Sequence, residues 1–176
     1  MEHLRAGLAA GDEMAFAQMY DLCADQLHRY LVVRLGSRAD ADDVLQETFV
    51  RLVRHTRTLK DVSSIAAYVF TVARNEATRF AHRKRREPSA GGVLRADALF
   101  AELGSDDLSR RETAELVARA LGELPRAQRE VVELKVYAEL TFREIAEITG
   151  SPQGTVATRY RTALEHLRRI LAEQYP

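Results

Sequence analysis

The first half of the chain carries stretches in which apolar residues recur at the three-to-four-residue spacing of an α-helix. The first stretch spans residues 12–34 and stops at Gly36, a residue type that commonly follows the end of a helix. Ser37 comes next and is suited to cap a second helix, with Asp40 three residues further on. The pattern therefore predicts two consecutive helices joined by a tight turn. The recurring positions of the first helix are Phe16, Tyr20, Leu27 and Leu31, and those of the second, which we expect to face inward, are Leu45, Phe49, Leu52 and Thr56.

A third helix is predicted from Ser63 or Ser64 to about Arg86. It ends where Pro88 and a pair of glycines interrupt the pattern. Residues 87–108 then mix turn-forming, acidic and isolated apolar residues, which is typical of a linker that contacts something along its length. The expected buried stripe of this third helix is Ala66, Phe70, Ala73, Ala77 and Phe80.

Helical spacing resumes near Ser109, breaks at the LGELP sequence and resumes over residues 126–138. A tighter unit follows, in which Thr141 and Glu144 match a capping box and Gly150 matches a helix end. Ser151 and Pro152 match an N-cap followed by proline at the first helical position. A short capped helix, a tight turn and a further helix form a helix-turn-helix. The last helix is expected to bury Val156, Tyr160, Ala163, Leu167 and Ile170.

These patterns together predict an all-α protein of two small helical domains joined by a flexible linker. The composition agrees, because 46% of the 176 residues are hydrophobic while glycine and proline are few and tryptophan is absent. We expect a first domain over residues 1–86, a linker over 87–108 and a second domain over 109–176 that contains the helix-turn-helix.

The outward face of the last helix is a candidate surface for duplex DNA. Rotation by about 100° per residue away from the buried Val156 turns Thr158 and Arg161 outward, where they could donate to base edges in a major groove. Arg159 lies nearer the buried edge and is a candidate phosphate contact. An ordinary helical hairpin with solvated polar residues is the alternative explanation. The candidate contacts are Gln153, Thr155, Ala157, Thr158, Arg159, Arg161 and Thr162.

A second candidate nucleic-acid surface lies opposite the apolar stripe of the third helix. An aromatic ring beside amide and cationic side chains can stack on an unpaired base, bond to its edge and follow its phosphates. Residues 79–86 carry five basic side chains and no acid, although the whole chain balances 26 basic against 26 acidic residues. A charged and merely solvated helix face would give the same pattern, and the residues alone leave both explanations open. The candidate set is Tyr68, Asn75, Arg79, His82, Arg83 and Arg86.

The second predicted helix directs acidic side chains away from its apolar face. Asp40, Asp43 and Glu47 lie on that outer side, with Val50 beside them. An acidic patch next to an apolar residue suits a basic protein partner. The helix dipole, which favours acids in the first turns, accounts for part of the same pattern.

Several classes of function are disfavoured. Cys23 is the single cysteine and cannot form an internal disulfide. The N-terminal residues lack an export signal, and no stretch approaches the roughly 20 apolar residues of a membrane span, so we expect a cytoplasmic protein without membrane insertion. The five histidines are scattered and no phosphate-binding loop or known catalytic motif is present, so we expect no enzyme activity, no cofactor and no metal site.

Three segments, in order, resemble the extracytoplasmic-function (ECF) sigma factors of bacterial RNA polymerase. They are DADDVLQETFVRL, AYVFTVARNEATRF and LPRAQREVVELKVYAELTFREIAEITGSPQGTVATRYRTALEHLRR, and the resemblance covers nearly the whole chain. It implies a transcription initiation factor that binds core RNA polymerase and directs it to promoter DNA. The first domain would be sigma region 2, which binds the polymerase clamp and melts the minus-ten element, and the second would be sigma region 4, which binds the minus-35 duplex. The implied polymerase contacts are Asp40, Asp43, Gln46, Glu47 and Val50.

Under this resemblance, the face that carries Tyr68 and Asn75 would meet the melted minus-ten strand, and the helix-turn-helix face would meet the minus-35 duplex. The linker would thread toward the active-site channel of the polymerase, and an anti-sigma factor becomes a candidate partner. The chain departs from the common family pattern at Ala157, Tyr160 and Thr78, so the minus-35 sequence is not predicted. Two other functions remain open on the residues alone. One is a stand-alone helix-turn-helix regulator, and the other is a helical adaptor that has lost DNA binding.

Overall fold

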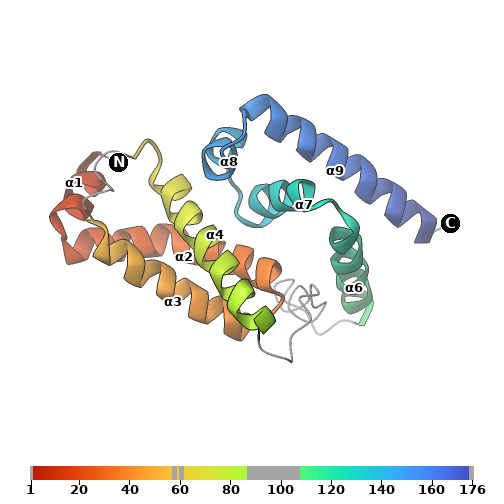
Figure 1. The fold of residues 1–176 in the computed structure, drawn as a ribbon, viewed down its shortest axis with the longest axis horizontal. Helices are drawn as coiled ribbons and strands as arrows, with labels where there is room; N and C mark the ends of the chain where they lie inside the picture. The colour runs from red at the N-terminus through yellow and green to blue at the C-terminus, as the bar shows by residue number, and fades with distance from the viewer. Residues whose placement is uncertain (1, 57–58, 60–61, 87–107, 175–176) are drawn as a thin grey trace.

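A computed structural model describes residues 2–56, 59, 62–86 and 108–174, and in those residues all regular secondary structure is helical (Figure 1). The prediction of an all-α chain is therefore confirmed. The predicted linker over residues 87–108 lies outside the described residues except for its last position. No helix in the described part of the chain combines the length and the apolar content that a bilayer span requires. The helices of the first half are α1 (Glu2–Ala10), α2 (Glu13–Leu35), α3 (Arg38–Arg54) and α4 (Ile65–Arg86), and those of the second half are α6 (Leu108–Glu123), α7 (Arg126–Val132), the π-helix η2 (Glu133–Tyr137), α8 (Phe142–Thr149) and α9 (Gln153–Gln174).

Helix α1 was not among the predicted elements. It buries Leu4 and Leu8 against α2, and the two helices cross closely at Gly7. A Cβ atom built on Gly7 would lie 2.8 Å from the Cβ of Ala15, so a side chain at this position would clash. Asp12 then caps α2 by accepting a hydrogen bond from the backbone N–H of Met14 at 2.9 Å.

The predicted turn between α2 and α3 is confirmed. Gly36 ends α2 in the left-handed conformation, with φ of 68°, and Ser37 caps α3 by accepting from the backbone N–H of Asp40. The predicted inward face of α3 is confirmed at Leu52, which is fully buried, but not at Leu45 and Phe49. Leu45 and Phe49 are only half-buried, because small side chains on the adjacent face let α3 pack closely against α2 and α4. The buried residues of α3 are Ala41, Val44, Thr48 and Leu52.

Helix α4 begins after Ser64, whose hydroxyl accepts from the backbone N–H of Ala67 at 3.2 Å. Its predicted stripe is confirmed at Phe70, Ala73 and Ala77, which are fully buried. The ring of Phe70 packs edge-on against Tyr30 of α2, with 5.7 Å between the ring centroids. Helices α2, α3 and α4 therefore form the core of the first domain, and one long face of α4 remains on the surface.

The helix-turn-helix is formed by α8 and α9. Both hydrogen bonds of the predicted capping box between Thr141 and Glu144 are present, and Gly150 ends α8 in the left-handed conformation. Helix α9 begins at Gln153, so the prediction of Ser151 as the N-cap with Pro152 inside the helix is wrong by one position. The carbonyl of Pro152 accepts from the backbone N–H of Val156 at 3.0 Å and so precedes the first helical residue. The helix predicted over residues 126–138 is divided, because its second half forms the wider turns of the π-helix η2.

The two halves of the chain pack directly on one another. Helix α8 lies beside the first turns of α4, and η2 lies against α2 (Figure 1). One continuous apolar core joins Tyr30 and Phe70 of the first domain to Leu134, Ile145 and Val156 of the second. The structure is therefore a closed arrangement of the two helical units.

Candidate nucleic-acid and protein interfaces

The first candidate interface is the outward face of α9. Val156 is fully buried against the rest of the second domain, which fixes the rotation of the helix about its axis. Thr158 and Arg161 are exposed, as the spacing predicts. The remaining members of the predicted set follow the same rotation: Gln153 and Thr155 are exposed, and Ala157 and Thr162 are half-buried at the border. An exposed second helix of a helix-turn-helix is the element that enters a DNA major groove.

Arg159 and Tyr160 have roles within the second domain. The guanidinium of Arg159 donates from Nη1 to the hydroxyl of Ser151 at 2.9 Å, which ties α9 to the turn of the helix-turn-helix. The ring of Tyr160 packs edge-on against Phe142, with 5.6 Å between the ring centroids. An aromatic residue at position 160 therefore fills the space between α8 and α9.

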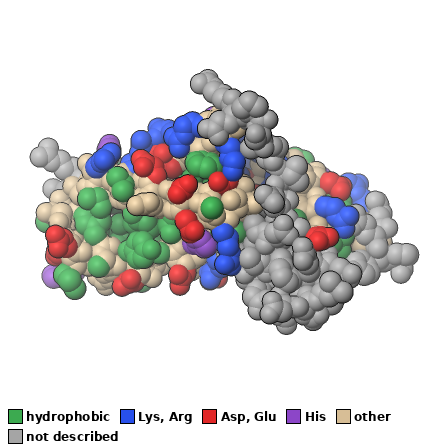
Figure 2. Space-filling model, turned by 90° about the horizontal axis from the view of Figure 1, so that it is seen from below, with side chains coloured by type: hydrophobic (Ala, Val, Ile, Leu, Met, Phe, Trp, Pro, Cys, Tyr) green, Lys and Arg blue, Asp and Glu red, His purple; other side chains and the backbone are tan. Residues whose placement is uncertain are grey.

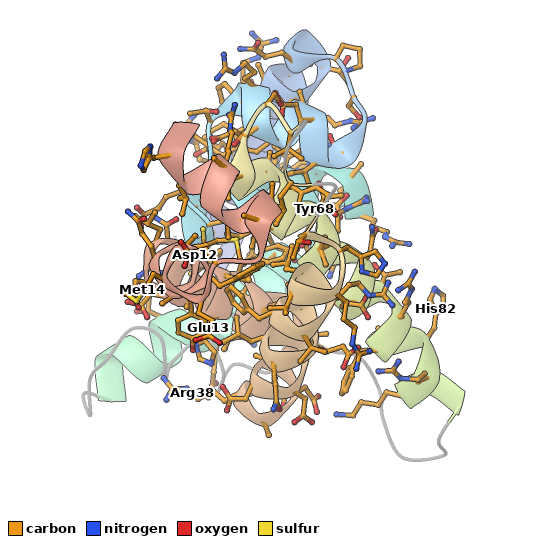
Figure 3. The ribbon with its side chains drawn as sticks, turned by 90° about the vertical axis from the view of Figure 1, so that its left-hand side faces the viewer. Asp12, Glu13, Met14, Arg38, Tyr68 and His82 are labelled. Carbon is orange, nitrogen blue, oxygen red and sulfur yellow. The ribbon has the colours of Figure 1, made fainter. Side chains whose placement is uncertain are left out.

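The second candidate interface is the surface of α4. Asn75, His82 and Arg83 are exposed, and His82 projects from the outer part of the helix (Figure 3). Tyr68 lies nearer the middle of the molecule, half-buried against the core (Figure 3). The side chain of Arg86 lies outside the described residues. The exposed members still place an amide, an imidazole and a guanidinium along one helix.

A buried carboxylate that the sequence patterns did not predict lies beneath this face. Glu76 is 4% exposed and accepts hydrogen bonds and ion pairs from Arg51 at 3.0 Å and Arg79 at 2.8 Å. The spacing of three residues between Glu76 and Arg79 was the signal available in the sequence. Because Arg79 is held by this carboxylate and is still about half exposed, its position on α4 is set before any ligand binds.

The third candidate interface is an apolar groove between α2 and α3. It has a volume of about 600 Å³, and the rings of Tyr20 and Phe49 meet in it with 4.7 Å between their centroids. Figure 2 shows hydrophobic side chains gathered on this face, with acidic side chains around them. Leu45 and Phe49, which we expected to face the core, are half-buried, because they pack against the edge of the core and also line this groove. Its lining is completed by Asp42, Gln46, Val50, Val53 and Arg54.

The acidic residues predicted on α3 divide into two groups. Asp43 and Glu47 are exposed beside the groove, and Gln46 and Val50 line it. Asp40 departs from the prediction of an outward side chain, because it is 16% exposed and forms an ion pair with Lys84 of α4. The reason is tertiary: the end of α4 lies over the first turn of α3. Among the described residues, no cluster of histidine, cysteine, aspartate or glutamate side chains could hold a metal ion.

Two helical domains, one with a helix-turn-helix and one with a long basic helix beside an apolar groove, define a class of DNA-binding protein. Comparison of the chain with models of known protein families identifies which family it belongs to. Residues 19–87 match the model of sigma-70 region 2, and residues 114–167 match that of sigma-70 region 4. The chain belongs to the ECF RNA polymerase sigma factors, and it directs RNA polymerase to promoters as a non-enzymatic factor.

Individual relatives cover nearly the whole chain. The ECF RNA polymerase sigma factor RpoE of Cereibacter sphaeroides is 32% identical over 92% of this chain and 88% of its own length. The ECF RNA polymerase sigma factor SigL of Mycobacterium tuberculosis is 31% identical over 96% of this chain and 95% of its own. Among solved structures, the sigma factor RpoE of Bartonella quintana, in complex with the anti-sigma factor NepR, is similar with a TM-score of 0.67, 25% identity and coverage of 89% of this chain and 96% of that chain. CnrH, in complex with the cytosolic domain of CnrY, shares the fold with a TM-score of 0.72 at 22% identity, and the match covers 98% of this chain and 97% of that chain.

Proposed function

We propose that the groove between α2 and α3 is the surface through which this sigma factor binds core RNA polymerase. The observation that carries the proposal is the combination of an apolar groove with exposed carboxylates at its edge. The apolar side chains of Val50 and Val53 are 36% and 53% exposed. Exposed apolar side chains that lie together on a protein surface mark a contact site. Asp43 and Glu47 lie beside them, so the partner surface is basic with an apolar centre.

The residues that we assign to this contact are Asp43, Gln46, Glu47 and Val50. Asp40 is left out, because its carboxylate already pairs with Lys84. Tyr20 and Phe49 line the groove, and their ring contact joins α2 to α3 there. We expect them to matter for the shape of the surface as well as for direct contact.

For the DNA, we propose a division between the two domains. The exposed face of α4, with Asn75, Arg79, His82 and Arg83, captures the melted minus-ten strand, and the exposed face of α9, with Thr158 and Arg161, reads the minus-35 duplex. Tyr68 is half-buried in the closed arrangement, so stacking on a base requires it to become more exposed. We place the domains at residues 1–86 and 109–176, and the protein in the cytoplasm, where RNA polymerase acts.

An anti-sigma factor is a further candidate partner. The support is the solved complex of RpoE from Bartonella quintana with the anti-sigma factor NepR, a sigma factor similar to this chain over most of its length. We propose that an inhibitor of this kind binds this chain when its promoters are silent. A pull-down from cells that express the tagged chain identifies the candidate inhibitor. The purified candidate is then added to RNA polymerase that carries this sigma factor, and the proposal predicts that transcription from its promoters stops.

The polymerase contact is tested by binding of the purified chain to core RNA polymerase. We expect the Asp43→Arg, Glu47→Arg double variant to bind at least tenfold more weakly, because two attractive charges at a basic surface become repulsive. The matched control is Glu123→Arg with Glu165→Arg, which makes the same charge change at exposed positions of the second domain. Equal loss of binding in both double variants would show that net charge, and not this surface, governs the interaction.

A further inference from the structure

A buried carboxylate holds two arginines together on the surface where α3 and α4 pack against each other (Figure 1). The Oε1 atom of Glu76 in α4 forms ion pairs with Nη1 of Arg51 in α3 at 3.0 Å and with Nη1 of Arg79 in α4 at 2.8 Å. The glutamate side chain is 4% exposed, whereas those of the two arginines are 38% and 53% exposed. We call these three residues the arginine clamp.

The shared oxygen atom limits how far apart the two arginines lie. Two nitrogens that are each within 3.0 Å of one atom are at most about 6 Å from each other. A phosphate oxygen accepts a charge-assisted hydrogen bond of about 2.8 Å, so both arginines can reach a single phosphate group. Among the described residues, each arginine gives one terminal nitrogen to Glu76, whereas a guanidinium carries five N–H donors. The pair is therefore placed to bind one phosphate group.

The charges of the arginine clamp exceed what the fold requires. One arginine is sufficient to pair with a buried carboxylate. The second arginine leaves the cluster with a positive charge in excess on a partly exposed surface. Two guanidinium groups at this separation repel each other, and the carboxylate between them offsets that repulsion. A structural ion pair accounts for one arginine, and an anionic ligand accounts for both.

The neighbouring side chains on α4 indicate which anion binds. Asn75 is exposed, and Arg79 follows it by one helical turn, about 6 Å along the axis. Arg83 is exposed one turn further on. A single strand of nucleic acid needs contacts to a base edge and to successive phosphates, whereas a free phosphate needs only the clamp. This row of side chains therefore favours the backbone of a single strand as the source of the phosphate.

We propose that Arg51 and Arg79 bind one backbone phosphate of the melted minus-ten strand, and that Glu76 is a positioning residue that holds them at the required separation. The inference rests on the proposed capture of this strand by α4 and adds a contact from α3. Arg51 lies outside the lining of the groove between α2 and α3. Helix α3 therefore presents one side to the polymerase and another to the DNA.

The phosphate site is tested first on the full chain with a short oligothymidylate. NMR resolves the Nε–H signals of the two arginines, and the Arg51→Lys and Arg79→Lys variants assign them. We expect the oligothymidylate to shift both signals and to bind the Arg51→Gln variant about tenfold more weakly than the wild type. No shift of the Arg51 signal at millimolar oligothymidylate would overturn the proposal.

Control variants separate the arginine clamp from net charge. Arg38→Gln makes the same charge change at an exposed position of α3 and should leave the affinity unchanged. Arg51→Lys keeps the charge but loses the planar fork, so it should restore only part of the affinity. In Arg51→Gln the buried carboxylate keeps Arg79, so circular dichroism should show a folded chain. If that variant does not fold, the triple variant Arg51→Gln, Glu76→Gln, Arg79→Gln removes the site without leaving a buried charge unpaired.

The salt dependence of binding counts the phosphates. Loss of one phosphate contact on a single strand lowers the slope of log affinity against log salt concentration by about 0.7, and loss of two lowers it by about 1.4. We expect the triple variant to lose the smaller amount, because both arginines bind the same phosphate. A loss of the larger amount would overturn the shared site.

The polymerase complex on promoter DNA fixes the register of the strand. Methylphosphonate linkages then remove the charge of one phosphate at a time along the minus-ten strand. One linkage should weaken binding of the wild-type complex and have little further effect with Arg51→Gln, because both changes remove the same contact. Additive losses at every linkage would overturn the assignment of Arg51 to a particular phosphate.

Two further comparisons separate this inference from its alternatives. Inorganic phosphate is titrated at the same phosphate concentration as the oligothymidylate, and equal shifts of both arginine signals would overturn DNA as the source. If Arg51→Gln weakens strand binding while Asn75→Ala opens promoters normally, the phosphate site stands and the proposed role of Asn75 fails. If Asn75→Ala impairs opening while Arg51→Gln behaves as Arg38→Gln does, strand capture by α4 stands and the phosphate site is wrong.

Discussion

Arg74 of α4 holds the carboxylate of Glu130 in α7 with two parallel hydrogen bonds, from Nε to Oε1 at 2.8 Å and from Nη2 to Oε2 at 3.1 Å. The residues are 56 positions apart and belong to different domains. A fork of two donors fixes both the distance and the orientation of the carboxylate, which a single point charge does not. This pair therefore sets the angle at which the second domain meets the first.

Replacement of Arg74 by lysine tests this geometric role. The charge is kept, but one ammonium group cannot donate to both oxygens in the same plane. We expect the folded chain to lose about 1–2 kcal/mol of stability, less than in the Arg74→Met variant, in which Glu130 keeps only Arg34. Urea denaturation of the wild type and the two variants gives this difference directly. A lysine variant as stable as the wild type would show that charge alone is sufficient.

Recognition of the minus-35 duplex should depend more on Arg161 than on Arg159. Arg161 is exposed and free to reach a base edge, whereas the guanidinium of Arg159 donates to Ser151 within the domain. We expect Arg161→Ala to cost about 1–3 kcal/mol and to relax the preference at one base pair. Binding of the polymerase complex to a set of single-base promoter variants measures both effects. Equal loss of preference in the Arg159→Ala variant would contradict this assignment.

Promoter opening should depend on Asn75. Its exposed amide on α4 can bond to the Watson–Crick edge of an unpaired base, an edge that base pairing conceals in the duplex. We expect Asn75→Ala to slow the rate at which thymines of the minus-ten element become unpaired and chemically reactive. The initial binding of the polymerase complex to the duplex promoter should be unchanged. The comparison variant is Arg83→Ala, which should weaken binding at every sequence and reduce the salt dependence by about one phosphate contact. An equal defect of both variants in the initial complex would argue against strand capture by Asn75.

The capping box of α8 should make this helix sensitive to acid. Burial acts to raise the pKa of Glu144, but hydrogen bonds from Thr141 and Ser64 outweigh it and place the pKa below the ordinary value. A carboxylate with a lowered pKa stabilises the fold above its unfolded pKa and loses that contribution as pH falls through the folded value. The difference in melting temperature between the wild type and Glu144→Gln should therefore be largest near neutral pH and shrink below about pH 4. A carboxyl titration followed by NMR should also show a higher pKa in the Thr141→Val variant.

Local sequence rules predicted the helix ends well. Ser37, Gly36, Thr141, Glu144 and Gly150 act through contacts with residues two to four positions away, so their effect is contained in the sequence itself. The family resemblance likewise rests on three segments whose residues and order along the chain are given by the sequence. The π-helix η2 was missed because its wider turns have no local signature, and it lies where the second domain meets α2.

The sequence by itself determined that the protein is all-helical, where most of its helices begin and end, and that it belongs with the ECF sigma factors. The tertiary structure decided what those helices present to a partner. Packing of α3 against two neighbours turned Leu45 and Phe49 into the groove and drew Asp40 to Lys84. It also joined Arg34 to Glu130, 96 positions away. Such pairs depend on how whole helices pack, and the spacing of residues along one helix contains no information about its neighbour.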